Sequence, residues 1–555
     1  MQIEGNIIDI FNKKIFFGSL QVEGKKIESI QELSPNINPN YPYICAGFVD
    51  AHVHIESSML TPIQFARLAV VHGTVATVSD PHEIGNVLGK EGVEYMIHNG
   101  RKTPFKFCFG APSCVPATTF ETAGATITPE DIQYLFENYA EVGYLAEVMN
   151  FPGVLNQDPD MMAKIALAQQ FAKPVDGHAP GLRGEAAKRY IEAGCQTDHE
   201  CFTIEEALDK LQYGMKILIR EGSAAKNFEA LIDLLPEHFE QLMFCSDDKH
   251  PDSLVEGHIN QLIQRALAKY PDLLFETLQV ACVNPVTHYQ LPVGLLRKGD
   301  YADFVIINNL TEFRIIQTYL NGQLVSDAGE TLIENLPSEV VNQFECQLTT
   351  ASDFEVEALG TKINVIEAID GQLITKSGIY DAKIVENCVV SDIEQDVLKI
   401  VVLNRYKPEK PAIAFIKNFG LFEGAIASTV AHDSHNIIAV GVDDSCICKA
   451  INLLIQAQGG VSAVDKNGVE KVLALPIGGL MSGEEGYSVA ENYSKIDQFA
   501  KQLGSKLTSP YMTLSFMALL VIPEIKLSNF GLFDGKSFAF TNLFANLNQQ
   551  TKNTV

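Results

Sequence analysis

The stretch GFVDAHVHIESS, residues 47–58, marks a change in the character of the chain. Before it, short β-branched runs alternate with turn residues, which is typical of a small antiparallel sheet. After it, each short apolar run is followed by a longer segment whose apolar residues recur at helical spacing. Alternation of this kind indicates β/α units with parallel strands, and residues 48–54 provide the first strand of the series.

Eight such apolar runs occur in this region, and eight is the number of parallel strands that closes a barrel. Proline near the first turn marks helix starts at Thr128–Glu130 and Asp158–Asp160. We therefore predict an α/β fold, a (β/α)8 TIM barrel over residues 47–285. The predicted strands are Phe48–His54, Thr74–Ser79, Lys106–Phe109, Tyr144–Val148, Pro174–Gly177, Gln196–Asp198, Lys216–Ile219 and Gln241–Cys245.

Both flanks of the predicted barrel contain strand-like runs. Residues 1–46 hold several of them, and residues 286–335 return to strands with the pair Asn321–Gly322 as a hairpin turn. Because these two segments border the barrel on either side, we predict that they combine in one small β-sandwich or sheet.

The rest of the chain forms a third predicted unit. At 555 residues the protein is too long for a single binding module, and several folding units are expected. Residues 336–555 combine strand-like runs with a helical run that stops at Gly459–Gly460, as helices often do at glycine. We predict a C-terminal α+β domain, with the polar tail 546–555 frayed.

The charge balance excludes two classes of partner. Lys and Arg total 41 against 69 Asp and Glu, so the formal net charge is −28. A field of this sign repels phosphate backbones and anionic lipid faces, so we expect neither nucleic-acid nor membrane partners. Eleven cysteines follow no disulfide framework, and no leader pattern or long apolar run stands in the chain, which favours a reducing cytoplasm.

His52 and His54 form the sharpest local signal. In a strand, residues i and i+2 project to the same face, so the two imidazoles lie side by side at the carboxyl end of the first barrel strand. Two imidazoles at this spacing suit one divalent cation. A His-x-His pair also occurs in structural or surface positions, so the pair alone leaves both interpretations open.

Metal-capable side chains recur where later predicted strands end, and barrel active sites are built at that rim. Each alone is compatible with an ordinary hydrogen-bonded residue, but six in register favour a metal site. Four imidazoles and two carboxylates exceed the needs of one tetrahedral ion, so two metals are implied, with Glu147 long enough to bridge them. Such ligands accept Zn, Fe(II) or Mn(II). The four further residues are Glu147, His178, His199 and Asp247.

Several long strings carry a resemblance to a known family. The chain is similar to the bacterial adenine deaminases of the amidohydrolase superfamily in GFVDAHVHIESSML, VSDPHEIGNVLG, LAEVMNFPGV, DGHAPGL, TDHE, REGSAAKN and CSDDKHP. The resemblance covers nearly the whole chain, including NPVTHYQLPVGLLRKGDYADFVII and HDSHNIIAVG. It implies hydrolysis of adenine to hypoxanthine and ammonia, for purine salvage, by a hydroxide that bridges two metal ions and attacks C6.

The resemblance also implies how the metals are held and which metals they are. Manganese or ferrous iron are expected to support the best activity, with zinc as a further possibility. The implied ligands are His52, His54 and Asp247 for one ion, His178 and His199 for the other, and Glu147 between the two.

Exchange of the amine at C6 for oxygen demands two proton transfers. We assign the transfer to the departing amine to Asp247, which would sit beside the hydroxide. We assign the acid beside N1 to Glu83, kept protonated by desolvation in a closed pocket, although Glu83 also suits the start of a helix. The predicted substrate contacts are His82, Arg220 and Ser223, and the residues predicted to orient the metal-binding histidines are Glu200 and Asp248.

Other interpretations are left open by the residues. The chain is also compatible with another amidohydrolase that acts on a heterocyclic amine or a cyclic amide. Hydantoinase- and dihydroorotase-like members usually carry a carboxylated lysine at the end of strand four, and the fourth predicted strand has no lysine there. His54-Ile55-Glu56 matches the H-x-E of zinc cytidine-type deaminases, yet Cys446-Ile447-Cys448 lacks their proline and their spacing. A metal-holding scaffold without turnover is a third class.

Two expectations concern features outside the predicted barrel site. His432 and His435 form a His-x-x-His cluster that belongs either to a polar loop of the C-terminal domain or to a lid over the purine pocket. We also expect a homo-oligomer, most simply a dimer.

Overall fold

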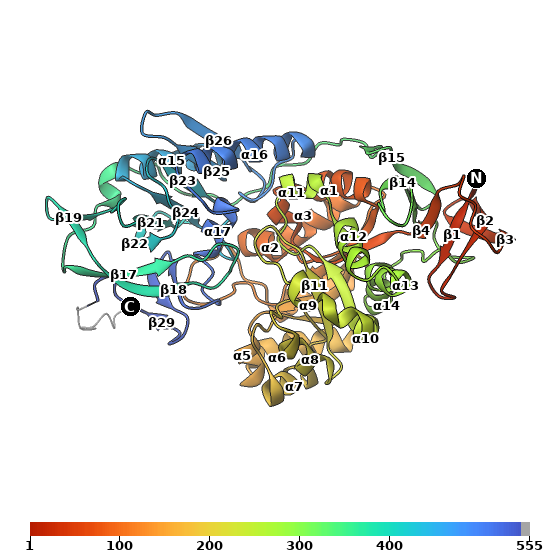
Figure 1. Ribbon diagram of the computed structural model, residues 1–555. Coiled ribbons are helices and arrows are strands. Elements are labelled where there is room, and N and C mark those ends of the chain that lie inside the picture. The colour runs from red at the N-terminus through yellow and green to blue at the C-terminus, as the bar shows by residue number, and fades with distance from the viewer. Residues whose placement is uncertain (546–555) are drawn as a thin grey trace.

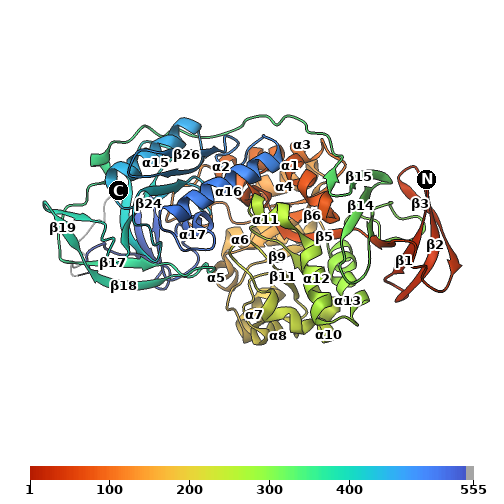
Figure 2. The ribbon, with the colours of Figure 1, turned by 45° about the horizontal axis from the view of Figure 1, so that its top comes forward.

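The computed structural model describes residues 1–545. A barrel of parallel strands occupies the centre of the molecule, with a small sheet on one side and the C-terminal part on the other (Figure 1, and turned in Figure 2). The tail predicted to fray, residues 546–555, lies outside the described residues. Within the described chain, no helix combines the length and the apolarity that a membrane crossing needs.

All eight predicted barrel strands are present, with small shifts at their ends. Their residues are buried because each strand is covered by the barrel interior on one face and by helices on the other. The strands are β5 (Phe48–Val53), β6 (Thr74–Ser79), β7 (Lys106–Ala111), β8 (Val142–Val148), β9 (Val175–Gly177), β10 (Thr197–Asp198), β11 (Lys216–Arg220) and β12 (Leu242–Cys245).

Main-chain hydrogen bonds close the barrel at two seams. Parallel ladders run from β5 to β9 and from β10 to β12. Between β9 and β10, the Gln196 N–H donates to the Val175 carbonyl at 2.9 Å. Between β12 and β5, the Asp247 N–H donates to the His52 carbonyl at 2.9 Å. The predicted barrel is therefore confirmed, and the second seam brings predicted ligands from its first and last strands side by side.

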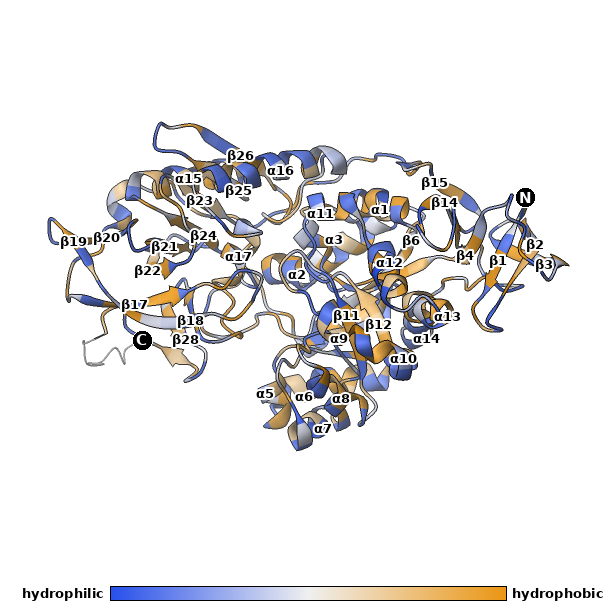
Figure 3. Cartoon of the chain, in the orientation of Figure 1, coloured by the Kyte–Doolittle hydropathy of each residue, from blue (hydrophilic) through white to orange (hydrophobic). Residues whose placement is uncertain are grey.

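Helices surround the barrel, and the two predicted helix starts are correct. Thr128 accepts a hydrogen bond from the Asp131 N–H at 3.2 Å, and Asp158 accepts one from the Met161 N–H at 3.0 Å, so both helices are capped. The helices are α1 (Pro62–Ala69), α2 (His82–Leu88), α3 (Lys90–Gly100), α4 (Pro129–Asn138), α5 (Phe151–Leu155), α6 (Pro159–Gln170), α7 (Gly184–Glu192), α8 (Ile204–Leu211), α9 (Phe228–Leu231), α10 (Leu235–His238), α11 (Pro251–Glu256), α12 (Ile259–Lys269), α13 (Leu274–Leu278) and α14 (Asn284–His288). In Figure 3 helices such as α8 mix hydrophilic and hydrophobic residues, as expected for a helix that packs on the protein with one face and meets solvent with the other.

The two flanks of the barrel share one sheet, in the order β16-β15-β14-β13-β4-β1-β2-β3. Strand β4 joins them, because it pairs in parallel with β1 and antiparallel with β13. Asn321 and Gly322, both at positive φ, form the predicted turn between β14 and β15. The strands are β1 (Gln2–Asp9), β2 (Lys14–Glu23), β3 (Lys26–Ser34), β4 (Tyr43–Ala46), β13 (Phe304–Ile307), β14 (Ile315–Leu320), β15 (Gln323–Asp327) and β16 (Glu330–Thr331).

The C-terminal part is built on a second sheet, in the order β18-β17-β22-β21-β24-β23-β25-β26. Apolar residues of α15 pack on one face of its central strands. The strands of this part are β17 (Lys362–Glu367), β18 (Lys376–Asp381), β19 (Lys383–Val385), β20 (Cys388–Val390), β21 (Val397–Leu403), β22 (Ala412–Lys417), β23 (Ala425–Ser428), β24 (Ile437–Gly441), β25 (Gly460–Val464), β26 (Glu470–Ala474), β27 (Ile525–Ser528), β28 (Gly531–Asp534) and β29 (Ala539–Phe540), and its helices are α15 (Asp444–Ala457), α16 (Gly486–Gln502) and α17 (Pro510–Phe516).

Helix α15 ends one residue earlier than predicted. Gln458, with φ of 59°, takes the left-handed position that the sequence suggested for glycine. Gly459 follows with φ of 120°, and a Cβ there would lie 2.4 Å from the Cα of Gly479. Glycine is therefore required at 459 by the close approach of another segment.

The C-terminal part docks on the rim of the barrel where the strands end. Helix α16 packs beside α11 and α1, as Figures 1 and 2 both show. The Ser482 N–H donates to the Met59 carbonyl at 2.9 Å, directly after the first barrel strand. We propose residues 1–46 with 286–335, 47–285 and 336–555 as the three units of the chain. The barrel mouth consequently lies between two of them.

Candidate active site

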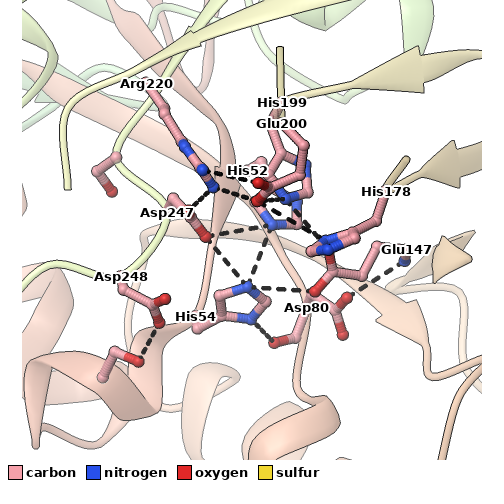
Figure 4. A network of polar contacts seen from close by, with 12 residues as sticks. His52, His54, Asp80, Glu147, His178, His199, Glu200, Arg220, Asp247 and Asp248 are labelled. Atoms are coloured by element: carbon pink, nitrogen blue, oxygen red, sulfur yellow. Dashed lines mark hydrogen bonds and ion pairs between the residues drawn. The ribbon is translucent and has the colours of Figure 1, made fainter. Parts of the chain in front are cut away.

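The six predicted metal ligands meet at the carboxyl ends of the barrel strands, where Figure 4 shows them pointing toward one another. His52 and His54 lie side by side, with 3.2 Å between their Nε2 atoms, because residues i and i+2 of a strand share a face. All six side chains are buried. The other four follow or end later strands: Glu147 on β8, His178 after β9, His199 after β10 and Asp247 after β12.

Glu147 lies between the two halves of this cluster. Its Oε1 is 3.5 Å from His54 Nε2, while its Oε2 is 2.7 Å from His178 Nδ1 and 3.1 Å from His199 Nε2. On the first side, Asp247 Oδ1 is 3.3 Å from His54 Nε2. One carboxylate therefore spans two groups of ligand atoms, as a bridging ligand must.

The donor atoms fit divalent cations. Overlapping sets of three or four buried side chains hold their ligand atoms within 4.8 Å of one another, among them His52, His54 and Asp247. In the described residues the ring nitrogens His52 Nδ1 and His178 Nε2 have no hydrogen-bond partner. Because buried polar atoms are normally paired, converging imidazoles and carboxylates with unmet capacity indicate a metal site.

Asp80, which the sequence analysis did not single out, orients this cluster. Its Oδ2 accepts from the Glu147 N–H at 3.3 Å, and its carbonyl oxygen is 3.1 Å from His54 Nδ1. A contact of the second ring nitrogen with an acceptor directs the first toward a metal. The sequence feature that could have pointed to Asp80 is its position directly after β6, next to the Pro81-His82-Glu83 motif.

His82 lies at the site, as the prediction that it contacts substrate requires. Its Nδ1 is 3.4 Å from Glu147 Oε1 and its ring centroid is 4.6 Å from that of His54. Its Nε2 faces the other way, 3.5 Å from Glu83 Oε1. His82 therefore lies between the metal ligands and the Glu83 side of the cavity.

Arg220 lies at the site but is committed to protein carboxylates. It is 1 % exposed, and its two terminal nitrogens bind both oxygens of Glu200 and Oδ2 of Asp247. Arg220 also lines the cavity, and its Nε has no partner among the described residues, so the contact with substrate stays a prediction. Glu200 also approaches His199 Nε2 at 3.4 Å, the same nitrogen that faces Glu147, and its orienting role stays a prediction.

Two predicted residues have other partners. Ser223 Oγ accepts from the His250 N–H at 2.9 Å, at the start of α11, and the residue does not line the cavity. The substrate contact at Ser223 stays a prediction. Asp248 lines the cavity and accepts from Ser57 Oγ at 2.5 Å, and its orienting role stays a prediction.

The C-terminal part covers the cavity. Beside the barrel residues, the lining includes Leu373, His432, Asp433, Phe516 and Leu519. The cavity has a volume of about 30 Å³, enough for a few water molecules at most. The His432 segment is therefore part of the pocket wall, which is the second of the two interpretations that its sequence allowed.

Glu83 joins the barrel to this covering segment. Its Oε1 is 2.5 Å from His432 Nδ1, and its Oε2 is hydrogen-bonded to His435 Nε2. Burial alone would raise the pKa of Glu83, but His432, His435 and His82 together hold that pKa well below its usual range. The prediction of a protonated Glu83 is therefore not supported, because its neighbours stabilise the carboxylate.

A buried lysine holds the cover in place. Lys526 on β27 donates to the carbonyl oxygens of Leu373, at 2.6 Å, and Phe516, at 2.9 Å. Burial lowers its pKa to about 7. Because Leu373 and Phe516 both line the cavity, this single ammonium ties two segments of the pocket wall together.

We expect Lys526→Met to raise KM for a small substrate about tenfold, because each lost contact with the charged group is worth about 1.5 kcal/mol. Steady-state kinetics measures the effect. Lys399→Met is the matched control, since Lys399 is also a buried lysine that donates to a carbonyl, of Phe354 at 2.7 Å, away from the cavity. An equal rise of KM in both variants contradicts the role of Lys526.

Comparison with known proteins agrees with this geometry. Residues 43–325 match the amidohydrolase family, and residues 372–539 match the adenine deaminase C-terminal domain. The chain is 54% identical to an adenine deaminase of Sulfurovum sp. (strain NBC37-1), over 97% of this chain and 99% of the relative. It is 50% identical to one of Salinibacter ruber, over 98% of each chain. The chain belongs to the adenine deaminase family.

This membership explains the arrangement of the pocket. The adenine deaminase C-terminal match includes Leu373, His432 and Phe516, which cover the barrel mouth. The amidohydrolase match includes all six predicted metal ligands. An adenine deaminase of Borreliella burgdorferi, 49% identical over 98% of this chain and 99% of the relative, spans the same two regions. In this family member, the site is thus assembled from both parts of the chain.

Proposed function

We propose that this protein hydrolyses adenine to hypoxanthine and ammonia. The observation that carries the proposal is the convergence of four histidines and two carboxylates beneath a cover that matches the adenine deaminase C-terminal domain. The relatives with about half of their residues identical are adenine deaminases.

The proposed cofactor is a pair of divalent metal ions, Mn(II) or Fe(II), with Zn(II) as an alternative. When bound, such ions supply a nucleophilic hydroxide near neutral pH. The residues we assign to them are His52, His54 and Asp247 for one ion, His178 and His199 for the other, and Glu147 for both.

Asp247 is the proposed proton shuttle. Its Oδ2 is held by Arg220, whereas its Oδ1 faces His54 among the ligand atoms. A carboxylate fixed by one oxygen keeps the other in a constant position, where it takes a proton from the attacking water and passes it to the departing amine.

The test of the activity is ammonia release from adenine. The chain is purified, stripped with a chelator and reconstituted with Mn(II), Fe(II) or Zn(II), and each form is assayed with adenine, cytosine, hydantoin and dihydroorotate. We expect ammonia from adenine in the reconstituted forms and none in the chelated form. Turnover of a cyclic amide without turnover of adenine contradicts the proposal.

We expect His52→Ala to remove adenine turnover and to leave the fold intact, because the ring binds metal and supports no part of the hydrophobic core. Ammonia release, metal content and far-UV circular dichroism are measured together. His98→Ala is the control, since His98 lies exposed near the end of α3. Full turnover in His52→Ala contradicts the ligand assignment.

We also propose a homodimer in the cytoplasm. All eleven cysteines are free, which suits a reducing compartment. Ile379 is 61% exposed on β18, an edge strand of the C-terminal sheet, and exposed apolar edges are common sites of association. Light scattering after size exclusion measures the assembly, and a mass of 60.9 kDa would contradict the dimer.

A further inference from the structure

The loop between β23 and β24 brings two histidines onto Glu83. His432 Nδ1 and His435 Nε2 each contact one oxygen of the same carboxylate. All three side chains are at most 3% exposed. Glu83 is separated from these histidines by about 350 positions in the sequence, so only docking of the C-terminal part creates the contact. The proposed proton shuttle, Asp247, uses none of these groups.

Glu83, His432 and His435 lie close enough together to hold a metal ion, but the hydrogen bonds favour a different interpretation. His435 Nδ1 accepts from the Ala431 N–H at 3.2 Å. A neutral imidazole that accepts at one nitrogen carries its proton on the other. His435 Nε2 therefore donates to Glu83 and has no lone pair for a metal. The cluster is a clamp on the carboxylate.

His432 has a second nitrogen that the clamp leaves unused. Its Nδ1 is turned to Glu83, while its Nε2 is buried and has no partner among residues 1–545. The ring stacks on Phe516, with centroids 4.7 Å apart and planes 17° apart, and the residue lines the cavity. Both contacts fix the direction of the ring.

The surroundings of His432 favour its protonated form. Burial lowers the pKa of His432, but Glu83 and then Asp248 outweigh burial and raise the pKa to about 9. At neutral pH both ring nitrogens then carry protons. One is donated to Glu83, and the other lies on the buried Nε2 of a residue that lines the cavity.

We propose that His432 is the acid that protonates N1 of adenine during attack at C6, with Glu83 and His435 as positioning residues. The proposal rests on the proposed function. As the oxygen–C6 bond forms, the electron pair of the C6–N1 double bond moves to N1, where the N1–H bond forms and the Nε2–H bond of His432 breaks. The proton stays on N1 of hypoxanthine. The C6–N bond to the amine breaks and ammonia leaves with the proton carried by Asp247, while the C6 hydroxyl loses its proton to solvent as the C6–oxygen double bond forms. A proton from solvent then restores His432.

The experiment compares ligands that differ only at one ring nitrogen. Purine, 1-deazapurine and 3-deazapurine lack the 6-amino group, and their dissociation constants are measured by calorimetry on the metal-loaded protein and on His432→Asn. Asn retains an amide near the Nδ1 position, for Glu83, and removes the group at Nε2. His432→Gln is the second variant, because its longer amide reaches the Nε2 position as a neutral donor. His98→Asn is the control.

We expect the wild-type protein to bind 1-deazapurine about tenfold more weakly than purine, and 3-deazapurine with a smaller loss. In His432→Asn the tenfold difference should fall below about threefold, and kcat for adenine should fall by about 10²-fold or more. His432→Gln should retain part of the discrimination and lose kcat.

Several outcomes overturn the proposal. Equal binding of purine and 1-deazapurine by the wild-type protein overturns it without any variant. An unchanged difference between the two dissociation constants in a folded His432→Asn also overturns it, as does adenine turnover in that variant within threefold of wild type. A wild-type protein that releases no ammonia from adenine instead overturns the proposed function, so the two failures are distinguishable.

Discussion

Glu147→Gln should reduce the bound metal from two ions per chain to at most one and lower kcat for adenine by more than about 100-fold. Loss of a partner that merely supports a metal ligand already costs 10- to 100-fold in such sites, and Glu147 contacts both halves of the cluster itself. Gln keeps the shape of the side chain but removes its charge and one of its two anionic oxygens. Metal analysis after gel filtration and ammonia release measure the two effects.

Glu141→Gln is the matched control for this variant. Glu141 lies just before the amino end of the same strand, β8, and pairs with Arg101 at 2.6 Å at the surface. We expect it to leave both metal content and kcat unchanged. Two tightly bound ions in Glu147→Gln would show that the carboxylate does not bridge them.

Asp247→Asn should lower kcat for adenine by about 10²- to 10⁴-fold, the range for loss of a positioned acid or base. It should also destabilise the protein by about 1.5 to 3 kcal/mol, because the buried Arg220 guanidinium loses one of its two carboxylate partners and keeps only Glu200. Burial would raise the pKa of Asp247, but Arg220 and His54 hold it well below its usual range, so the native group is a carboxylate. Steady-state kinetics and urea unfolding measure the two losses.

Asp209→Asn separates a general charge effect from the local one. Asp209 also pairs with an arginine, Arg183 at 2.8 Å, but does so at the protein surface. We expect unchanged kcat and an unchanged unfolding midpoint there. If Asp247→Asn retained at least one third of the wild-type kcat, Asp247 would not be the proton shuttle.

Short-range patterns were sufficient to predict the barrel and the metal-capable side chains that gather at its rim. The barrel strands are short, buried runs between helices, so apolar runs such as Thr74–Ser79 mark them with little ambiguity. Parallel strands of a barrel present their carboxyl ends on one rim, so a residue such as His178 at the end of a predicted strand is assigned to that rim without coordinates.

Hydrogen-bond partners could not be predicted in the same way. Arg220 ends a barrel strand and Ser223 follows it, as substrate-binding residues often do, and the structure pairs them with Asp247 and with the start of α11. Position along a strand predicts which end a side chain reaches. It does not predict which neighbour takes its hydrogen bonds.

The sequence by itself determined the barrel, its closing sheet and the six side chains that gather at the rim, because each depends on local periodicity and on the polarity of parallel strands. Only the tertiary structure decided the charge state around Glu83 and the role of the C-terminal part. His432 reaches Glu83 through the docking of one unit on another. Which of these two side chains carries the proton depends on the buried charges around each of them. That balance depends on distances across the fold, which no spacing along the chain encodes.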